Sequence, residues 1–87
     1  MVSQKTTIRN PLGMDLWPAG LCCKTAAQFQ SKITFHHENT IANAKSVLSV
    51  LGACIKNGDE IEIICEGVDE EKALREMLRV IENGLSE

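Results

Sequence analysis

The spacing of apolar and polar residues along this chain predicts four strands and three helices. Residues 5–9 have the Thr and Ile content of a strand, and the breaker Asn-Pro-Leu-Gly follows at 10–13. A helix is expected from about Pro18, because proline is favoured in the first helical turn. Its apolar residues recur at helical spacing and share one face: Ala19, Cys22, Cys23, Ala26 and Phe29.

The middle of the chain predicts a hairpin and a short helix. Residues 32–37 alternate as in a half-buried strand, and a turn at 38–39 leads into a short partner strand over 40–43. Ser46 stands where a helix N-cap is expected, and the helix that it opens should stop by residues 52–58. Ile33, Phe35 and His37 should share one side of the half-buried strand over 32–37.

The last third predicts a strand and an amphipathic helix. Residues 60–66 alternate, and Asp69 is the expected N-cap of a helix that ends at Gly84. Glu70 and Glu71 suit the first turn of that helix because they complement its dipole. Its buried stripe should consist of Leu74, Met77, Leu78, Ile81 and Leu85.

The element order βαββαβα in one domain, residues 1–87, predicts an α+β fold with the helices on one face of a small antiparallel sheet. The order alone also fits ferredoxin-like and other split βαβ folds.

The charge and the hydropathy of the chain limit the classes of function that we expect. The net charge is −3, and no Lys/Arg cluster is interleaved with aromatic residues, so nucleic-acid binding is not expected. The longest apolar run, 47–55, is too short to span a bilayer, and the start lacks a secretory signal. We expect a cytoplasmic protein that does not bind membranes.

The four cysteines predict free, core-packed thiols. The pair at 22–23 falls on a helix, and Cys54 and Cys65 fall in apolar segments. The alternative is a metal site that combines this pair with the histidines at 36–37. The spacing of these residues does not favour it, because neighbouring strand residues point to opposite faces. The sequence therefore indicates no metal and no cofactor.

Three segments together resemble the HPr family, the histidine-containing phosphocarrier proteins of the phosphoenolpyruvate-dependent sugar phosphotransferase system. Residues 13–19, Gly-Met-Asp-Leu-Trp-Pro-Ala, resemble the family's Gly-x-His-x-Arg-Pro-Ala. Residues 43–48 resemble its Asn-x-Lys-Ser segment, which carries a regulatory serine, and residues 67–74 resemble the start of its last helix. The spacing of the three segments matches without an obvious insertion, and the resemblance covers nearly the whole chain.

The resemblance implies an open-faced β-sandwich, in which three helices cover one face of a four-stranded antiparallel sheet. In the family, a histidine at the head of the first helix takes phosphate from the first enzyme of the pathway and passes it to sugar-specific enzymes. In many members an ATP-dependent kinase phosphorylates the serine, and the product acts as a corepressor. The resemblance therefore implies phosphotransferase-system proteins, an HPr kinase or a transcriptional regulator as partners of a monomer that is not an enzyme.

Asp15 replaces the family's phosphorylated histidine, and Trp17 replaces its arginine. Three interpretations of Asp15 stay open. It stabilises the helix dipole, by about 0.3–1 kcal/mol; it mimics the phosphorylated histidine permanently; or it carries phosphate as an acyl phosphate. Trp17 either folds over the loop or anchors a partner, since tryptophan is enriched at binding hot spots.

Ser46 is either a helix cap or a phosphorylation site, and in the second case Val47, Leu48 and Leu51 would form the docking patch. The histidines at 36–37 are expected on a strand away from the helix entrance, so they should not replace the lost histidine. The sequence favours an HPr-like regulatory or binding module without histidine phosphocarrier activity. The alternatives are an active phosphocarrier that uses Asp15 and a structural or dimerising module.

Overall fold

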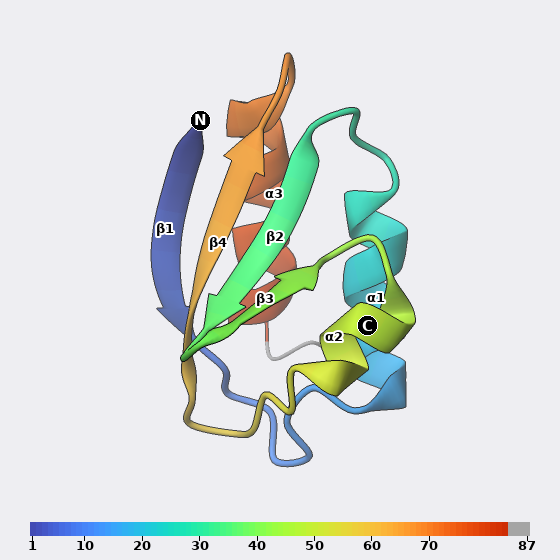
Figure 1. The fold of residues 1–87 in the computed structure, drawn as a ribbon, viewed down its shortest axis with the longest axis vertical. Helices are drawn as coiled ribbons and strands as arrows, with labels where there is room; N and C mark the ends of the chain where they lie inside the picture. Colours follow the sequence, from blue (N-terminus) through green and yellow to red (C-terminus); the bar gives the residue numbers. More distant parts are fainter. Residues whose placement is uncertain (84–87) are drawn as a thin grey trace.

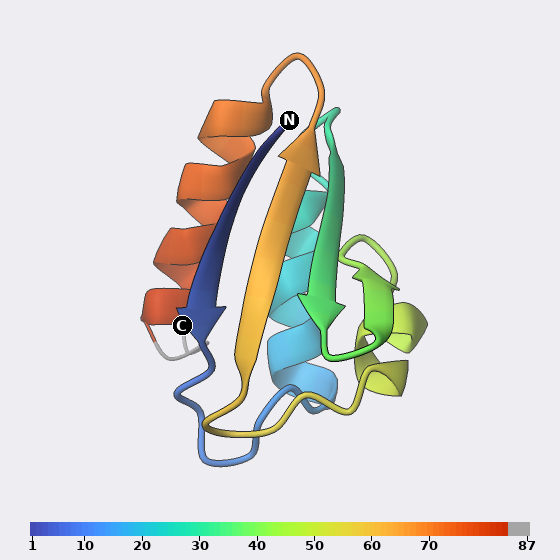
Figure 2. The same ribbon diagram turned by 60° about the vertical axis from the view of Figure 1, so that its left-hand side comes forward.

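The computed structural model describes residues 1–83 and has the predicted order of strands and helices (Figure 1). The elements are β1 (Val2–Thr7), α1 (Leu16–Ala26), β2 (Lys32–His37), β3 (Thr40–Asn43), α2 (Val47–Gly52), β4 (Glu60–Glu66) and α3 (Glu70–Glu82). The helices lie on one side of the sheet, and Figure 2 shows that no described element covers its other face. The predicted α+β open-faced sandwich is therefore confirmed.

The four strands form one antiparallel sheet in the order β1-β4-β2-β3. β4 lies between β1 and β2, so Ile63 pairs with Gln4 on one side and with Phe35 on the other. Because successive strand residues point to opposite faces, this register places the apolar residues of β2 and β4 together beneath the helices. His37 is on the same buried face as Phe35, as the alternation predicts.

The core is built mainly from aliphatic side chains and cysteines. The predicted apolar face of α1 is buried, and Phe29, which follows the helix, is buried with it. In α3 the buried residues are Ala73, Met77, Val80 and Ile81, while Leu74 and Leu78 are half-buried. The predicted contribution of Leu85 and the helix stop at Gly84 lie outside the described residues.

Two predictions made from local patterns were wrong in detail. The first strand covers Val2–Thr7 instead of 5–9, because β4 is long enough to pair with the chain as far back as Val2. The chain leaves the sheet after Ile8, whose amide donates to Asp59 O (2.9 Å).

Asp69 occupies the N-cap position of α3 but does not cap the helix with its side chain. Its carboxylate instead accepts hydrogen bonds from the Ser31 hydroxyl, from Gln30 N (2.9 Å) and from Ser31 N (3.0 Å). These bonds, that of the Ser31 hydroxyl first, lower the pKa of Asp69. The carboxylate of Asp69, which the local pattern predicts to cap α3, thus accepts hydrogen bonds from the α1–β2 loop instead.

Candidate functional site

The loop that precedes α1 is fixed against the loop between α2 and β4. Gly13 has φ +66°, and a Cβ atom there would lie 2.7 Å from Ile55 O and 2.9 Å from Lys56 Cα. The amide of Met14 donates to Ile55 O (2.9 Å). Glycine is therefore required at position 13, both for its backbone conformation and for the close approach, and the head of α1 is held in a defined place.

Asp15 is the N-cap residue of α1 in position, yet its side chain makes no cap hydrogen bond. The carboxylate atom Oδ1 is buried and accepts no hydrogen bond from the described residues. The backbone carbonyl of Asp15 accepts from Ala19 N (2.9 Å), so the first helical turn is formed normally. A buried acceptor without a donor is uncommon in folded proteins and calls for an explanation. The N-terminus of α1 is therefore a place where an anion would be favourable, and the carboxylate of Asp15 already lies there.

Large apolar side chains are exposed around this helix entrance. Trp17 is 56% exposed, which leaves its ring accessible to a partner. Leu12 and Leu16 are exposed beside it in the sequence, and neither was predicted from the sequence to belong to the site. Their signal is present in the pattern: both are apolar, and both stand before the buried face of α1 begins at Ala19.

α2 packs against α1 and adds to this region (Figure 1). Leu48 is 81% exposed, as a docking residue should be. Val47 and Leu51 are half-buried and pack against the core, so of the three residues of the predicted docking patch Leu48 is the most exposed. We call the exposed residues the apolar surface: Leu12, Leu16, Trp17 and Leu48.

Ser46 caps α2 as predicted, because its hydroxyl oxygen accepts from Ser49 N (3.2 Å). The hydroxyl of Ser49 in turn accepts from Asn43 N (2.8 Å), which ties the start of the helix to the end of β3. Lys45 Nζ donates to Phe29 O (2.6 Å). The contacts of Lys45 and Ser49 therefore hold the segment around Ser46 in place, and Ser46 itself is half-buried.

The histidines do not lie at the head of α1. His37 is 6% exposed and contacts Ala53 O and Asp59 Oδ2, whereas His36 lies on the open face of the sheet. Within residues 1–83 no group of three or more His, Cys, Asp or Glu side chains is placed to hold a metal ion. None of the described helices has the length and the apolar content that crossing a bilayer requires.

All four cysteines are free thiols. Burial raises the pKa of Cys22 to about 12 and that of Cys65 to about 11, and Cys23 is shifted in the same direction. Cys54 differs from the prediction because it is exposed, in a loop where it adopts φ +54°. Three cysteines therefore pack as small hydrophobic residues, and the fourth does not.

The chain is similar to a known protein family along nearly its whole length. The family model described as "PTS HPr component phosphorylation site" matches residues 2–83. The phosphocarrier protein HPr of Lysinibacillus sphaericus is 34% identical over the whole of both chains. The HPr-like protein Crh of Bacillus subtilis is 29% identical and covers 94% of this chain and 96% of its own.

Solved structures give the same result. The crystal structure of HPr-C-His from Thermoanaerobacter tengcongensis is 31% identical and superposes with a TM-score of 0.95, covering 100% of this chain and 98% of its own. Crh of Bacillus subtilis, described as an intertwined dimer with a swapped domain, is 28% identical, with a TM-score of 0.78 and full coverage of both chains. A dimer among the similar structures leaves the expected monomer without support. The chain belongs to the HPr family.

Proposed function

We propose that this HPr-family chain is a regulatory or binding module of the sugar phosphotransferase system that does not carry phosphate on a histidine. The proposal is supported by the pair Asp15 and Trp17 at the head of α1, which stand where the resemblance of residues 13–19 to the family's segment puts its histidine and arginine. We further propose that the whole chain, residues 1–87, acts as one unit in the cytoplasm.

The chemistry of the helix entrance supports this proposal. An imidazole nitrogen is absent from position 15, and the carboxylate that replaces it already places negative charge at the helix N-terminus. A guanidinium, which suits the geometry of phosphate, is absent from position 17. Asp15 would therefore act as a permanent charge at the place where the family puts a phosphate, with Trp17 as an apolar anchor for the partner.

α2 supplies the second part of the proposal. Phosphorylation of Ser46 would add about −1.5 to −2 charges at a helix start. The backbone N–H groups there lack partners within the helix, and they stabilise negative charge. The neighbouring Leu48 is exposed, so the same modification would give the apolar surface a charged rim. A phosphotransferase-system protein, an HPr kinase or a transcriptional regulator would then recognise this surface without any change of fold.

The first test concerns phosphate transfer. The chain is incubated with phosphoenolpyruvate and a cognate first enzyme of the pathway, and phosphate is detected by intact mass. We expect no stable phosphate on the unmodified chain, slow or partial transfer to Asp15→His, and clearly more to the double variant with Trp17→Arg. Robust phosphorylation of the unmodified chain that Asp15→Asn abolishes would instead establish a carrier that works through an acyl phosphate.

The second test concerns Ser46. An ATP-dependent HPr kinase should add one phosphate to the chain, and Ser46→Ala should prevent it. Ser49→Ala, three residues further along the same helix, is the matched control and should still be modified. If a normal HPr is phosphorylated in the same tube while this chain is not, Ser46 is a helix cap only.

A dimerising module is the second candidate, favoured by the swapped dimer of the similar Crh structure. β1 lies at the edge of the sheet, where a strand from another copy could replace it. Light scattering after gel filtration, over a range of protein concentrations, decides between monomer and dimer. A dimer whose mass does not change on dilution would favour this candidate.

A further inference from the structure

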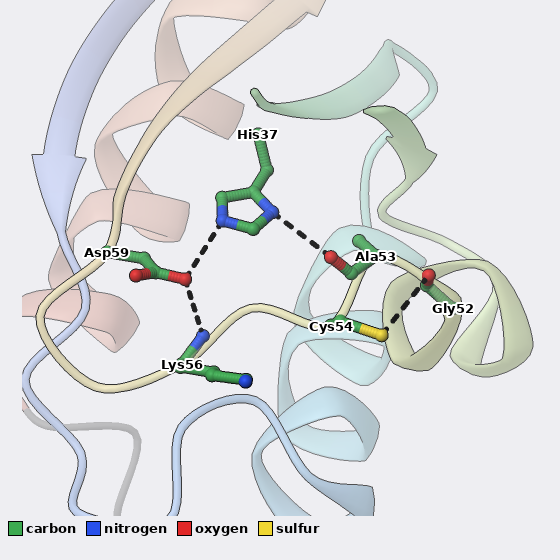
Figure 3. A network of polar contacts seen from close by, with 6 residues as sticks. All are labelled: His37, Gly52, Ala53, Cys54, Lys56 and Asp59. Atoms are coloured by element: carbon green, nitrogen blue, oxygen red, sulfur yellow. Dashed lines mark hydrogen bonds and ion pairs between the residues drawn. The ribbon is translucent and has the colours of Figure 1, made fainter. Parts of the chain in front are cut away.

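A buried histidine links three elements of the fold. His37 is the last residue of β2, and strand alternation turns its ring toward the helices. Its Nδ1 atom lies 3.0 Å from Ala53 O, and its Nε2 atom lies 2.9 Å from Asp59 Oδ2 (Figure 3). Ala53 ends α2, and Asp59 immediately precedes β4. One side chain therefore connects β2, α2 and the start of β4.

Both contacts of the ring are made to hydrogen-bond acceptors. A backbone carbonyl has no proton to give, and Asp59 Oδ2 already accepts from Lys56 N (2.9 Å). A neutral imidazole has one N–H group, whereas the protonated ring has two. Only the protonated ring can therefore donate to Ala53 and Asp59 at the same time. In the neutral ring one of the two contacts brings a lone pair against an acceptor, which is repulsive.

The contact to Ala53 matters because it satisfies the end of α2. Carbonyl groups in the last turn of a helix lack partners within the helix, and the ring of His37 donates to the carbonyl of the C-cap residue. α2 has no basic residue in its own last turn that could take this role. The six-residue helix thus receives a hydrogen bond at its C-terminal end from a neighbouring strand, at a place where positive charge is favourable.

Charged side chains face the ring from the β2–β3 turn and from the α2–β4 loop. A hollow of about 420 Å³ beside it is lined by Glu38 from the β2–β3 turn and by Cys54, Lys56 and Asp59 from the α2–β4 loop. α2 contributes no charged side chain. Two carboxylates thus face one ammonium group, and Glu38, Cys54 and Lys56 are exposed, so protons can reach the ring from this side.

We propose that His37 is a protonation-dependent clamp on α2: the doubly protonated ring holds the C-terminal end of the helix against the start of β4, and loss of one proton releases one of these contacts. Histidine is the side chain that ordinarily changes charge in the physiological pH range. If α2 carries the partner surface, as the proposed function holds, the clamp would make the order of that surface depend on pH.

The test measures the clamp in the isolated protein by NMR. Ring nitrogen shifts report the protonation state of His37 between about pH 5 and pH 9, and amide hydrogen exchange reports the order of α2 over the same range. The informative amides are those of Val50, Ala53 and Cys54, which are hydrogen-bonded at this helix. The amide of Ile63 in the central strand serves as the internal reference.

As the ring loses its proton, the protection of the α2 amides relative to Ile63 should fall by about tenfold, since a hydrogen bond to a charged group contributes roughly that factor or more. His37→Gln, which has no ring proton to lose, should show the same relative protection at every pH. His36→Gln removes the neighbouring histidine on the open face of the sheet and should behave like the unmodified chain.

Three results would overturn the clamp: a ring that keeps one protonation state throughout, relative protection that stays constant while the ring titrates, or an unchanged fall in His37→Gln. If His37→Gln does not fold, the two measurements on the unmodified chain decide alone. Kinase modification of Ser46 is followed separately. A working clamp in a chain that no kinase modifies would reject the phosphorylation part of the proposed function and leave the clamp in place.

Discussion

The head of α1 and the C-terminal end of α2 differ in whether their buried polar atoms have hydrogen-bond partners. At the head of α1, Asp15 Oδ1 is buried without a hydrogen-bond donor from the described residues. At the end of α2, both ring nitrogens of His37 have partners within 3.0 Å. Folded proteins satisfy nearly all their buried polar groups. The contacts of the histidine are therefore explained by the fold, whereas the unpaired carboxylate is not, and it lies at the helix start to which the proposed function assigns a permanent charge.

The largest effect should come from the contact that joins these two regions. In Gly13→Ala the new Cβ would meet Ile55 O and Lys56 Cα at a backbone φ of +66°. Strain and overpacking each cost about 1–3 kcal/mol, so a loss of about 2–4 kcal/mol of unfolding free energy is expected in urea titrations.

The matched control for this substitution is Gly20→Ala. A Cβ atom at Gly20, inside α1, has no neighbour within 4 Å. Alanine should therefore be neutral there or should stabilise the helix by up to about 1 kcal/mol. Equal effects of the two substitutions would mean that the loop before α1 is free to move away from Ile55.

The two N-cap positions should differ in what their side chains contribute. Ser46→Ala removes the hydrogen bond from Ser49 N and should cost about 1 kcal/mol. Asp15→Ala removes no side-chain hydrogen bond, so only its dipole contribution is lost, while a buried unpaired oxygen is relieved. We expect its cost to stay below about 0.5 kcal/mol in the same urea titrations. A cost for Asp15→Ala as large as that for Ser46→Ala would show that the carboxylate has a partner in solution.

The carboxylate beside His37 should make stability depend on acid. Hydrogen bonds from Lys56 N and then from His37 lower the pKa of Asp59 in the folded chain. The unfolded chain therefore takes up the proton first as the pH falls. The stability that Asp59 contributes is complete above the ordinary carboxyl pKa of about 3.9 and is lost as the pH falls through the lower folded value.

In Asp59→Asn the melting temperature should consequently fall less steeply below about pH 4 than in the unmodified chain. The decline should persist in part, because the pKa of Asp69 is lowered as well. Glu60→Gln, at the neighbouring exposed position, is the control and should follow the unmodified chain. Parallel curves for Asp59→Asn and the unmodified chain would show that Asp59 is not held by these hydrogen bonds.

Sequence patterns located the strands and helices because burial repeats with the period of each element. The inward position of His37 follows from the alternation of β2, and the cap at Ser46 follows from a short-range motif. The partners of buried polar groups follow no such period. Asp59 lies 22 residues from His37, and Asp69 lies 38 residues from Ser31. A local pattern therefore assigned Asp69 to its own helix and left His37 without a partner.

The candidate site shows the same limit on a smaller scale. Three segment resemblances placed Asp15, Trp17 and Ser46 at two helix starts, and the structure has them there. The exposure of single residues was less predictable. Val47 and Leu51 look like Leu48 in the sequence, but in so short a helix two of three neighbouring apolar residues can still reach the core. This difference in exposure depends on the orientation of α2 relative to the sheet, and the spacing of residues along the sequence does not determine that orientation.

The smallest effect is expected for the thiols. Here the reactivity of buried and exposed cysteines is compared, and not the stability of the fold. The thiolate is the reactive form of cysteine. Cys22 and Cys65 are buried, and their pKa values of about 12 and about 11 leave little thiolate at neutral pH. Cys54 is exposed beside the His37 contacts. A disulfide-exchange reagent should therefore modify one thiol rapidly in the folded chain and all four in denaturant, and Cys54→Ser should remove the rapid phase alone. Rapid reaction of two or more thiols would show that the core around Cys22, Cys23 or Cys65 opens, and fewer than four in denaturant would show that a disulfide forms.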